Sequence, residues 1–217
     1  MMPVHPTKII GIGRNYVAHA RELGNEMPEV PIIFFKPPTS LIGTGDPIQL
    51  PDVSSRVEFE AEIGVVIGKR IRHADAAGAE RAIDGYVCVN DVTCRDLQKK
   101  DGQWGRAKGF DTFCPVGPKV VSGLDWRALE LICRVNGVER QRARASDMHF
   151  SIPELVSFLS GVMTLEPGDL IATGTPSGVA MGYTPPRWLR PGDVIEITIE
   201  GIGTIRNPVV GVMRDVV

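Results

Sequence analysis

The stretch Arg56-Val-Glu-Phe-Glu-Ala-Glu-Ile-Gly-Val-Val-Ile-Gly68 first alternates glutamates with apolar residues and then becomes almost entirely apolar. Because successive side chains of a β-strand point to opposite faces, Glu58, Glu60 and Glu62 are predicted to share one face. Residues 63–67 are predicted to continue as a buried strand. The sequence therefore directs three carboxylates toward the interior of the protein.

Three converging carboxylates need a compensating charge. Two of them at a separation of about 5 Å and an effective dielectric of about 20 repel each other by roughly 3 kcal/mol. A divalent cation with oxygen ligands offsets this repulsion, and carboxylates without Cys or His favour Mg²⁺, Mn²⁺ or Ca²⁺ over zinc. Alternatively, the stretch is an antiparallel edge strand whose polar face lies in water. The stretch alone leaves both interpretations open.

The composition is that of a globular protein, with 43% hydrophobic and 23% charged residues among 217, so neither a disordered chain nor a coiled coil is indicated. A net charge of -2 gives no reason to expect nucleic acid or an anionic membrane as a partner. The chain has no apolar run of about 18 residues and no apolar stretch typical of a signal peptide at its N-terminus. We expect a soluble cytoplasmic protein.

The turn and strand signals predict a β-rich α+β fold, a roll or sandwich with a few short helices, in one domain over residues 1–217. Asn136-Gly137 is the preferred pair for a tight hairpin turn, and residues 194–205 form a second hairpin pattern. Short helices are predicted at 17–23, 74–83 and 152–160. The four cysteines show neither a CxxC pair nor a zinc-site spacing, and we expect them to be free.

Two polar segments, residues 17–23 and residues 93–111, are candidates for functional roles. His19 and Glu22 are three residues apart on a predicted helix, so the carboxylate can orient the imidazole for acid–base work, or both side chains can face water. Thr93 is predicted to cap a short helix, with Asp96 completing a capping box. Residues 99–111 are polar and glycine-rich and are predicted to form a functional or mobile loop.

Several segments together resemble, in the right order, the motif series of the fumarylacetoacetate hydrolase family. They are Gly13-Arg-Asn-Tyr16 with His19-Ala-Arg-Glu22, Phe35-Lys-Pro37, residues 60–69, residues 90–98, Ala107-Lys-Gly-Phe110 and Thr173-Gly-Thr-Pro-Ser-Gly178. The resemblance spans about residues 9–212. It implies a single catalytic domain with the mixed β-sandwich roll of the family's C-terminal domain.

The resemblance also implies a set of site residues. Three carboxylates would bind Mg²⁺ or Mn²⁺, a helical pair would carry the acid–base chemistry, a lysine would join them, and further residues would contact substrate. The residues that match these roles are Glu60, Glu62 and Asp91 for the metal, His19, Glu22 and Lys108 for catalysis, and Arg14, Lys36, Gln98 and Thr175 for substrate. Glu58 has no role in this pattern.

The function implied first is the hydrolysis of 3-acylpyruvates, such as fumarylpyruvate or acetylpyruvate, to pyruvate and a carboxylic acid. In this reaction His19 takes a proton from the attacking water, and the metal and Lys108 stabilise the enolate that leaves. Alternatives that use the same enolate are oxaloacetate decarboxylation and isomerisation of 2-hydroxyhepta-2,4-diene-1,7-dioate or 5-carboxymethyl-2-hydroxymuconate in aromatic catabolism. A non-enzymatic binder of small dicarboxylates is a further alternative.

Two expectations concern the surface. Family members that resemble this chain are usually homodimers, so a homodimer is expected. Residues 182–189 match the family pattern least, and they are expected to form a dimer contact, the distal end of a substrate pocket or a plain packed loop.

Overall fold

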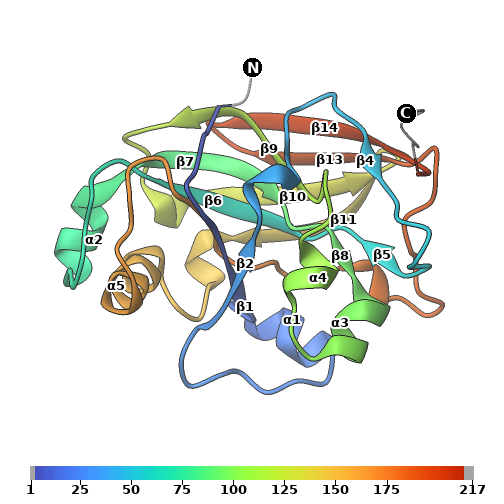
Figure 1. Cartoon of the computed structure of the whole chain (residues 1–217), viewed down its shortest axis with the longest axis horizontal. Helices are drawn as coiled ribbons and strands as arrows, with labels where there is room; N and C mark the ends of the chain where they lie inside the picture. The colour runs from blue at the N-terminus through green and yellow to red at the C-terminus, as the bar shows by residue number, and fades with distance from the viewer. Residues whose placement is uncertain (1–2, 213–217) are drawn as a thin grey trace.

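The computed structural model describes residues 3–212. Its larger sheet has seven strands in the order β2-β1-β12-β6-β7-β9-β3. Figure 1 labels five of these strands, β1, β2, β6, β7 and β9. These strands are β1 (Ile9–Gly13), β2 (Ile32–Lys36), β3 (Leu41–Ile42), β6 (Ala61–Ile67), β7 (Ile83–Asn90), β9 (Cys114–Val121) and β12 (Leu170–Ala172). A two-stranded ladder pairs β5 (Val57–Glu58) with β8 (Thr93–Cys94).

The second sheet has five strands in the order β11-β10-β13-β14-β4. They are β4 (Ile48–Gln49), β10 (Glu130–Val135), β11 (Val138–Arg144), β13 (Val194–Ile199) and β14 (Gly203–Val210). The α-helices are α1 (Val17–Glu22), α2 (Ala76–Ala82), α3 (Arg95–Asp101), α4 (Gly105–Lys108) and α5 (Ile152–Val162). Single turns of 3₁₀ helix lie at Pro38–Ser40, Trp126–Ala128, Ala145–Asp147 and Ala180–Gly182.

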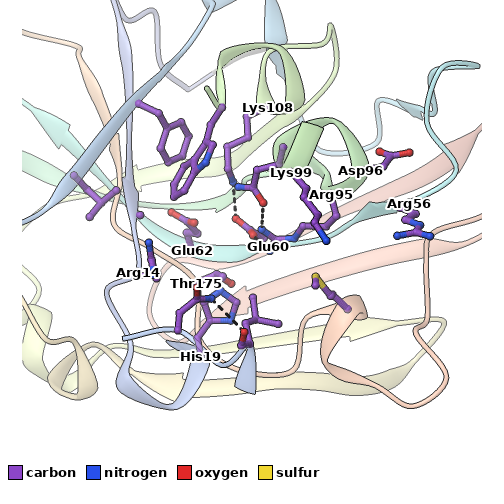
Figure 2. A pocket seen from close by; sticks show the side chains of 18 of the residues that line it. Arg14, His19, Arg56, Glu60, Glu62, Arg95, Asp96, Lys99, Lys108 and Thr175 are labelled. Carbon is purple, nitrogen blue, oxygen red and sulfur yellow. Dashed lines mark hydrogen bonds and ion pairs between the residues drawn. The ribbon is translucent and has the colours of Figure 1, made fainter. Parts of the chain in front are cut away.

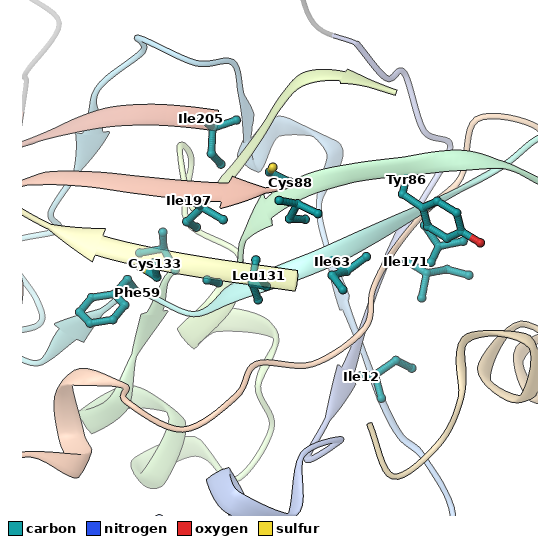
Figure 3. Close-up of a cluster of buried hydrophobic side chains, with 14 of the residues drawn as sticks. Ile12, Phe59, Ile63, Tyr86, Cys88, Leu131, Cys133, Ile171, Ile197 and Ile205 are labelled. Atoms are coloured by element: carbon teal, nitrogen blue, oxygen red, sulfur yellow. The ribbon is translucent and has the colours of Figure 1, made fainter. Parts of the chain in front are cut away.

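The two sheets pack against each other through apolar side chains (Figure 3). Leu131 and Ile197 of the five-stranded sheet belong to the same buried cluster as Ile63 and Cys88 of the seven-stranded sheet. Each aliphatic side chain buried in this way stabilises the fold by roughly 1.5–3 kcal/mol. The predicted β-rich α+β fold is confirmed.

The strand β6 lies in the middle of this arrangement, between β12 and β7, and all its residues are buried. It does not continue through all three glutamates, because the chain leaves regular strand geometry between β5 and β6. At this break the backbone N–H of Glu60 donates to Asn90 Oδ1 (3.0 Å), and that of Ala61 donates to Gln141 Oε1 (3.0 Å). The prediction of one continuous strand from Glu58 to Ile67 is therefore wrong, since side chains replace the ladder at the break.

Most predicted local elements are present. The predicted helices correspond to α1, α2 and α5, and both hairpins are found as β10–β11 and β13–β14. Asn136 and Gly137 have φ values of 52° and 76°, as the tight turn requires. All four cysteines are free and buried. No helix within residues 3–212 is long and apolar enough to cross a membrane.

Two predictions in the polar segment after β7 are wrong. Cys94, not Thr93, is the N-cap of α3, because the Thr93 hydroxyl donates to the carbonyl of Asp91 (2.8 Å) instead. The segment 99–111 is also more ordered than a loop, since it contains the end of α3 and the one-turn helix α4. Gly102, with a φ of 69°, supplies the left-handed conformation that ends α3.

Asp169 joins the first residues of the described chain to the start of β12. Its buried carboxylate accepts hydrogen bonds from Thr7 Oγ1 (2.7 Å), Lys8 N (3.2 Å) and Glu166 N (2.8 Å), and it pairs with Lys8 Nζ. Burial acts to raise the pKa of Asp169, but the hydrogen bonds, the one from Lys8 first among them, outweigh it and lower the pKa. The ionised carboxylate therefore stabilises the fold.

We predict that Asp169→Asn lowers the free energy of unfolding at pH 7 by about 2 kcal/mol, because hydrogen bonds to a charged acceptor are lost. Since the native pKa is lowered, the stabilisation is complete above the unfolded-state pKa of about 3.9 and disappears as the pH falls through the native pKa. Urea unfolding at pH 7 and pH 3 measures this difference. The control is Glu166→Gln, which breaks only an exposed ion pair with Arg70 and should change stability by less than about 1 kcal/mol.

Candidate active site

The register between β6 and β7 brings together three carboxylates from distant parts of the chain. Ala61 pairs with Asn90, and the backbone N–H of Asp91 donates to the carbonyl of Glu60 (2.8 Å). One carboxylate oxygen from each of Glu60, Glu62 and Asp91 lies within 4.8 Å of the others, and all three residues are buried. The predicted carboxylate triad (Glu60, Glu62 and Asp91) is thus assembled by the sheet.

Three cationic side chains contact this carboxylate triad or its neighbour Glu58. Lys108 Nζ donates to Glu60 Oε2 (2.8 Å) and to Asp91, and Lys36 Nζ donates to Asp91 Oδ1 (2.5 Å). The guanidinium of Arg95 bridges Glu60 and Glu58.

Glu62 is the member of the triad that lacks a cation. Within residues 3–212 its carboxylate forms a hydrogen bond with the backbone N–H of Gly174 (2.8 Å) and no ion pair. Burial, together with the charges of Asp91 and Glu60, raises the pKa of Glu62 well above its usual range. For Glu60, burial is outweighed by the charges of Arg95 and Lys108, and the pKa falls to about 2.

The charge balance fits a divalent cation. Four buried carboxyl groups, counting Glu58, share the three cations Lys36, Arg95 and Lys108, and Glu62 is the carboxyl group without a cationic partner. The ligand atoms are carboxylate oxygens without thiol or imidazole, which are the donors that Mg²⁺ and Mn²⁺ prefer. The residues present therefore fit such an ion, with Glu60, Glu62 and Asp91 as its ligands.

His19 and Glu22 form the predicted pair on α1. His19 Nδ1 lies 3.3 Å from Glu22 Oε2, and Glu22 Oε1 accepts a hydrogen bond from the backbone N–H of Gly178 (2.9 Å). His19 is buried. The imidazole is thus fixed by Glu22 on the side of the cavity that faces the carboxylate triad.

The glycine at position 178 is required for this contact. Its φ is 101°, and a Cβ atom there would lie 1.9 Å from the backbone oxygen of Arg140. Any larger residue would displace the loop whose N–H binds Glu22.

A cavity of about 800 Å³ opens over the carboxylate triad (Figure 2). In this view His19 and Thr175 lie on one side of Glu60 and Glu62, and Lys108 lies on the other. Seven of the predicted site residues line the cavity, namely Arg14, His19, Glu60, Glu62, Gln98, Lys108 and Thr175. The other three, Glu22, Lys36 and Asp91, are not part of this lining.

Lys36 and Thr175, both predicted to contact substrate, are placed differently by the structure. The Lys36 ammonium is fully buried against Asp91 and does not reach the cavity, so we assign it the role of positioning Asp91 in place of a substrate contact. Thr175 lines the cavity, but its hydroxyl donates to the carbonyl of Ala61 (2.9 Å) and accepts from Gln141 Nε2 (2.8 Å). Thr175 therefore joins the loop that follows β12 to the start of β6.

Sequence reasoning missed several residues of the site. Arg95 was part of a recognised motif, but only the fold shows that it bridges Glu58 and Glu60. The rings of Phe34 and Trp104 have centroids 5.4 Å apart, and Lys108 Nζ lies 4.8 Å from the Phe34 ring. The sequence did contain one signal for Trp104, namely Gly13, because a glycine inside a strand often marks the close approach of another group. In the structure a Cβ atom at Gly13 would lie 2.5 Å from the Trp104 ring.

The weakly matched segment 182–189 contributes to the cavity wall. Pro186 and Trp188 line the cavity, together with Met181 just before them. Met181 donates its backbone N–H to Glu58 (2.8 Å), which anchors the segment beside Arg95. Of the three roles expected for this segment, the lining of the pocket is the one that the described residues show.

We predict that Mg²⁺ or Mn²⁺ at about 100 times its Kd raises the Tm of the wild-type protein by roughly 5–10 °C, since the ion binds the folded state alone. Glu62→Gln should lose most of this increase. Its metal-free form should be at least as stable as the metal-free wild type, because a repelled carboxylate is gone. Differential scanning calorimetry measures both effects.

The matched control for this experiment is Glu80→Gln, an exposed glutamate on α2. It should keep the full metal-dependent increase. An equal increase in Glu62→Gln and wild type would contradict the assignment of the metal site.

Comparisons with known proteins agree with this geometry. Residues 8–210 match the family model described as fumarylacetoacetate (FAA) hydrolase C-terminal. The chain is 48% identical over 214 residues to oxaloacetate tautomerase YisK of Bacillus subtilis, covering 96% of this chain and 71% of that protein.

Solved structures show the same likeness. The crystal structure of 2-hydroxyhepta-2,4-diene-1,7-dioate isomerase from Mycobacterium marinum matches with a TM-score of 0.88 and 46% identity, covering 98% of this chain and 78% of that one. The structure of 5-carboxymethyl-2-hydroxymuconate delta-isomerase from Mycobacterium smegmatis matches with a TM-score of 0.88 and 49% identity, covering 98% and 82%. The chain therefore belongs to the fumarylacetoacetate hydrolase family, whose C-terminal domain it matches over nearly its whole length.

Proposed function

We propose that this protein is a metal-dependent enzyme that moves a proton at the carbon beside the ketone of a 2-oxo dicarboxylic acid, as a tautomerase or isomerase. The observation that carries the proposal is the contact of the buried His19 with the partly buried Glu22, because His19 and the carboxylates of Glu60 and Glu62 line one cavity. The printed names of the relatives, an oxaloacetate tautomerase and two diene-acid isomerases, support the same class of reaction.

His19 is the proton-transferring group in this proposal. With Nδ1 donating to Glu22, the lone pair of Nε2 stays available as a base. Nε2 takes a proton from the carbon beside the ketone, the electron pair of the broken C–H bond forms a C=C bond, and the negative charge moves to the ketone oxygen. Return of the proton to that oxygen gives the enol, and its return to a more distant carbon gives an isomer.

Lys108 supplies fixed positive charge beside this reaction. Burial acts to lower its pKa, but the charges of Asp91 and Glu60 outweigh burial and raise it, so the ammonium stays protonated. A divalent cation bound by the carboxylate triad would supply further charge for the substrate carboxylate and the developing oxyanion. Positive charge held in place before the reaction stabilises such an oxyanion without reorganisation.

A second candidate is the hydrolysis of 3-acylpyruvates. It is favoured by the cavity volume of about 800 Å³, which is much larger than a four-carbon acid needs. Here His19 takes a proton from water, the water oxygen bonds to the acyl carbon, and the C–C bond breaks. The electron pair of the C–C bond leaves with the pyruvate enolate, which then takes up a proton.

A homodimer also stays a prediction, which analytical ultracentrifugation checks.

We predict that the metal-loaded protein speeds the loss of the enol absorbance of oxaloacetate, and that His19→Gln lowers this rate by about 10²–10⁴-fold, the usual contribution of a general base. His5→Gln replaces an exposed histidine and should keep the wild-type rate. Deuterium uptake at the carbon beside the ketone, followed by NMR, measures the same proton transfer independently.

Product analysis separates the alternatives. Pyruvate and CO₂ from oxaloacetate would indicate decarboxylation, and pyruvate from acetylpyruvate or fumarylpyruvate would indicate hydrolysis. A His19→Gln protein with the full tautomerisation rate would show that the proposed mechanism is wrong.

A further inference from the structure

The cavity has a second group of cations, away from the carboxylate triad. Arg56 precedes β5, and Lys99 lies on α3. The side chains of both residues line the cavity, and we call them the cationic rim (Arg56 and Lys99). Figure 2 shows Arg56 at the opposite end of the view from Arg14, with Glu60 and Glu62 between them.

The backbone holds the two rim residues on one side of the cavity. The N–H of Arg95, the first residue of α3, donates to the carbonyl of Arg56 (2.9 Å). Arg95, Gln98 and Lys99 stand at positions i, i+3 and i+4 of α3, so they share a helix face, and all three line the cavity. The same helix face therefore carries both the Arg95 guanidinium at Glu60 and the Lys99 ammonium further along the cavity.

Unlike Lys108 and Arg95, the rim cations have no acidic partner within residues 3–212. Arg14, at the opposite end of the cavity, shares this property, but its guanidinium donates to the backbone carbonyl of Glu26 (3.4 Å). Lys108 and Arg95 are each paired with buried carboxylates. Within the described residues 3–212, neither the Arg56 guanidinium nor the Lys99 ammonium forms a hydrogen bond or an ion pair.

Asp96, an acidic residue that lines the same cavity, is engaged elsewhere. Its carboxylate accepts hydrogen bonds from Ser54 Oγ (2.6 Å) and the backbone N–H of Leu97 (2.9 Å). Two unpaired cations thus remain beside one occupied carboxylate, and the rim carries a net positive charge that an anionic group would neutralise.

The separation between the cationic rim and the carboxylate triad suits an extended ligand whose far end binds at the rim. Arg56 precedes Glu60 by four residues, so its Cα lies at most about 13 Å from that of Glu60. Lys99 lies four residues after Arg95, about 6 Å further along the helix axis. In Figure 2 the Arg56 side chain lies apart from Glu60 and Glu62, so a ligand that reaches both Arg56 and the triad is an extended one.

We infer that the cationic rim binds the second carboxylate of the substrate and makes the enzyme select 2-oxo dicarboxylates over 2-oxo monocarboxylates of equal length. This inference rests on the proposed function, because it assumes that the 2-oxo acid group lies at the carboxylate triad. Arg56 can bind a carboxylate through two parallel N–H groups, and Lys99 adds a second positive charge. Trp188 and Pro186 line the cavity as apolar neighbours of the connecting carbon chain.

The test compares two ligands of equal length, 2-oxoadipate and 2-oxohexanoate, which differ in the terminal carboxylate. Calorimetric titration of the Mg²⁺-loaded protein should show that wild type binds 2-oxoadipate at least about 10-fold more tightly. The double variant Arg56→Gln/Lys99→Gln should lose about 10- to 100-fold in affinity for 2-oxoadipate, the scale of charge-assisted hydrogen bonds. Its affinity for 2-oxohexanoate should not change.

Lys100→Gln is the matched control, because Lys100 is the exposed neighbour of Lys99 on α3 and does not line the cavity. It should bind both ligands as wild type does. Equal losses for the two ligands in the double variant, or no preference for 2-oxoadipate in wild type, would overturn the inference.

Oxalate separates failure of the rim from failure of the proposed function. It is too short to reach the rim, so wild type and the double variant should bind it equally in the presence of Mg²⁺. If oxalate binds and the rim has no effect on 2-oxoadipate, the rim assignment alone is wrong. If oxalate does not bind the Mg²⁺-loaded wild type, the proposed function and the inference that rests on it are both wrong.

Discussion

The balance of buried charge at the ends of β6 and β7 is the constraint on which the rest of the site depends. Four carboxylates and three cations are removed from water there, and each ion loses several kcal/mol of hydration that only close pairing offsets. Removing one partner leaves an unpaired buried charge, so each of these side chains is needed by its neighbours. Glu62 has no cationic partner, and burial together with the charges of Asp91 and Glu60 raises its pKa, so a divalent cation beside it would supply the missing positive charge.

A single loop connects the carboxylate triad to the acid–base pair. Gly174 N–H binds Glu62 of the triad, Gly178 N–H binds Glu22, and Met181 N–H binds Glu58. Backbone donors from residues 174–181 thus hold three carboxylates that differ in role. Because these donors belong to one segment, the position of His19 relative to the triad is set by the same backbone that fixes Glu62. Glu58, which matched no family role, serves here by anchoring the loop and orienting Arg95.

Patterns between near neighbours predicted much of the fold. The Asn136-Gly137 turn, the helix at Ile152–Val162 and the buried strand β6 depend on local backbone preferences and on side-chain periodicity, which the sequence displays directly. Thr93 shows where this reasoning fails. Its position suits an N-cap, but its hydroxyl instead donates to the Asp91 carbonyl and accepts a hydrogen bond from Lys108 (2.8 Å). These contacts outweigh the preference of threonine for the N-cap position, which is worth about 1 kcal/mol.

The sequence by itself determined the β-rich fold, the family and the carboxylates of the candidate metal site, because these follow from periodicity and from an ordered series of motifs. Only the tertiary structure decided that Lys36 lies behind Asp91, that Arg95 bridges Glu58 and Glu60, and that Arg56 and Lys99 share one side of the cavity. The physical reason is that a charge acts through space. Its partners are set by strand register and helix packing, which join residues far apart in the chain.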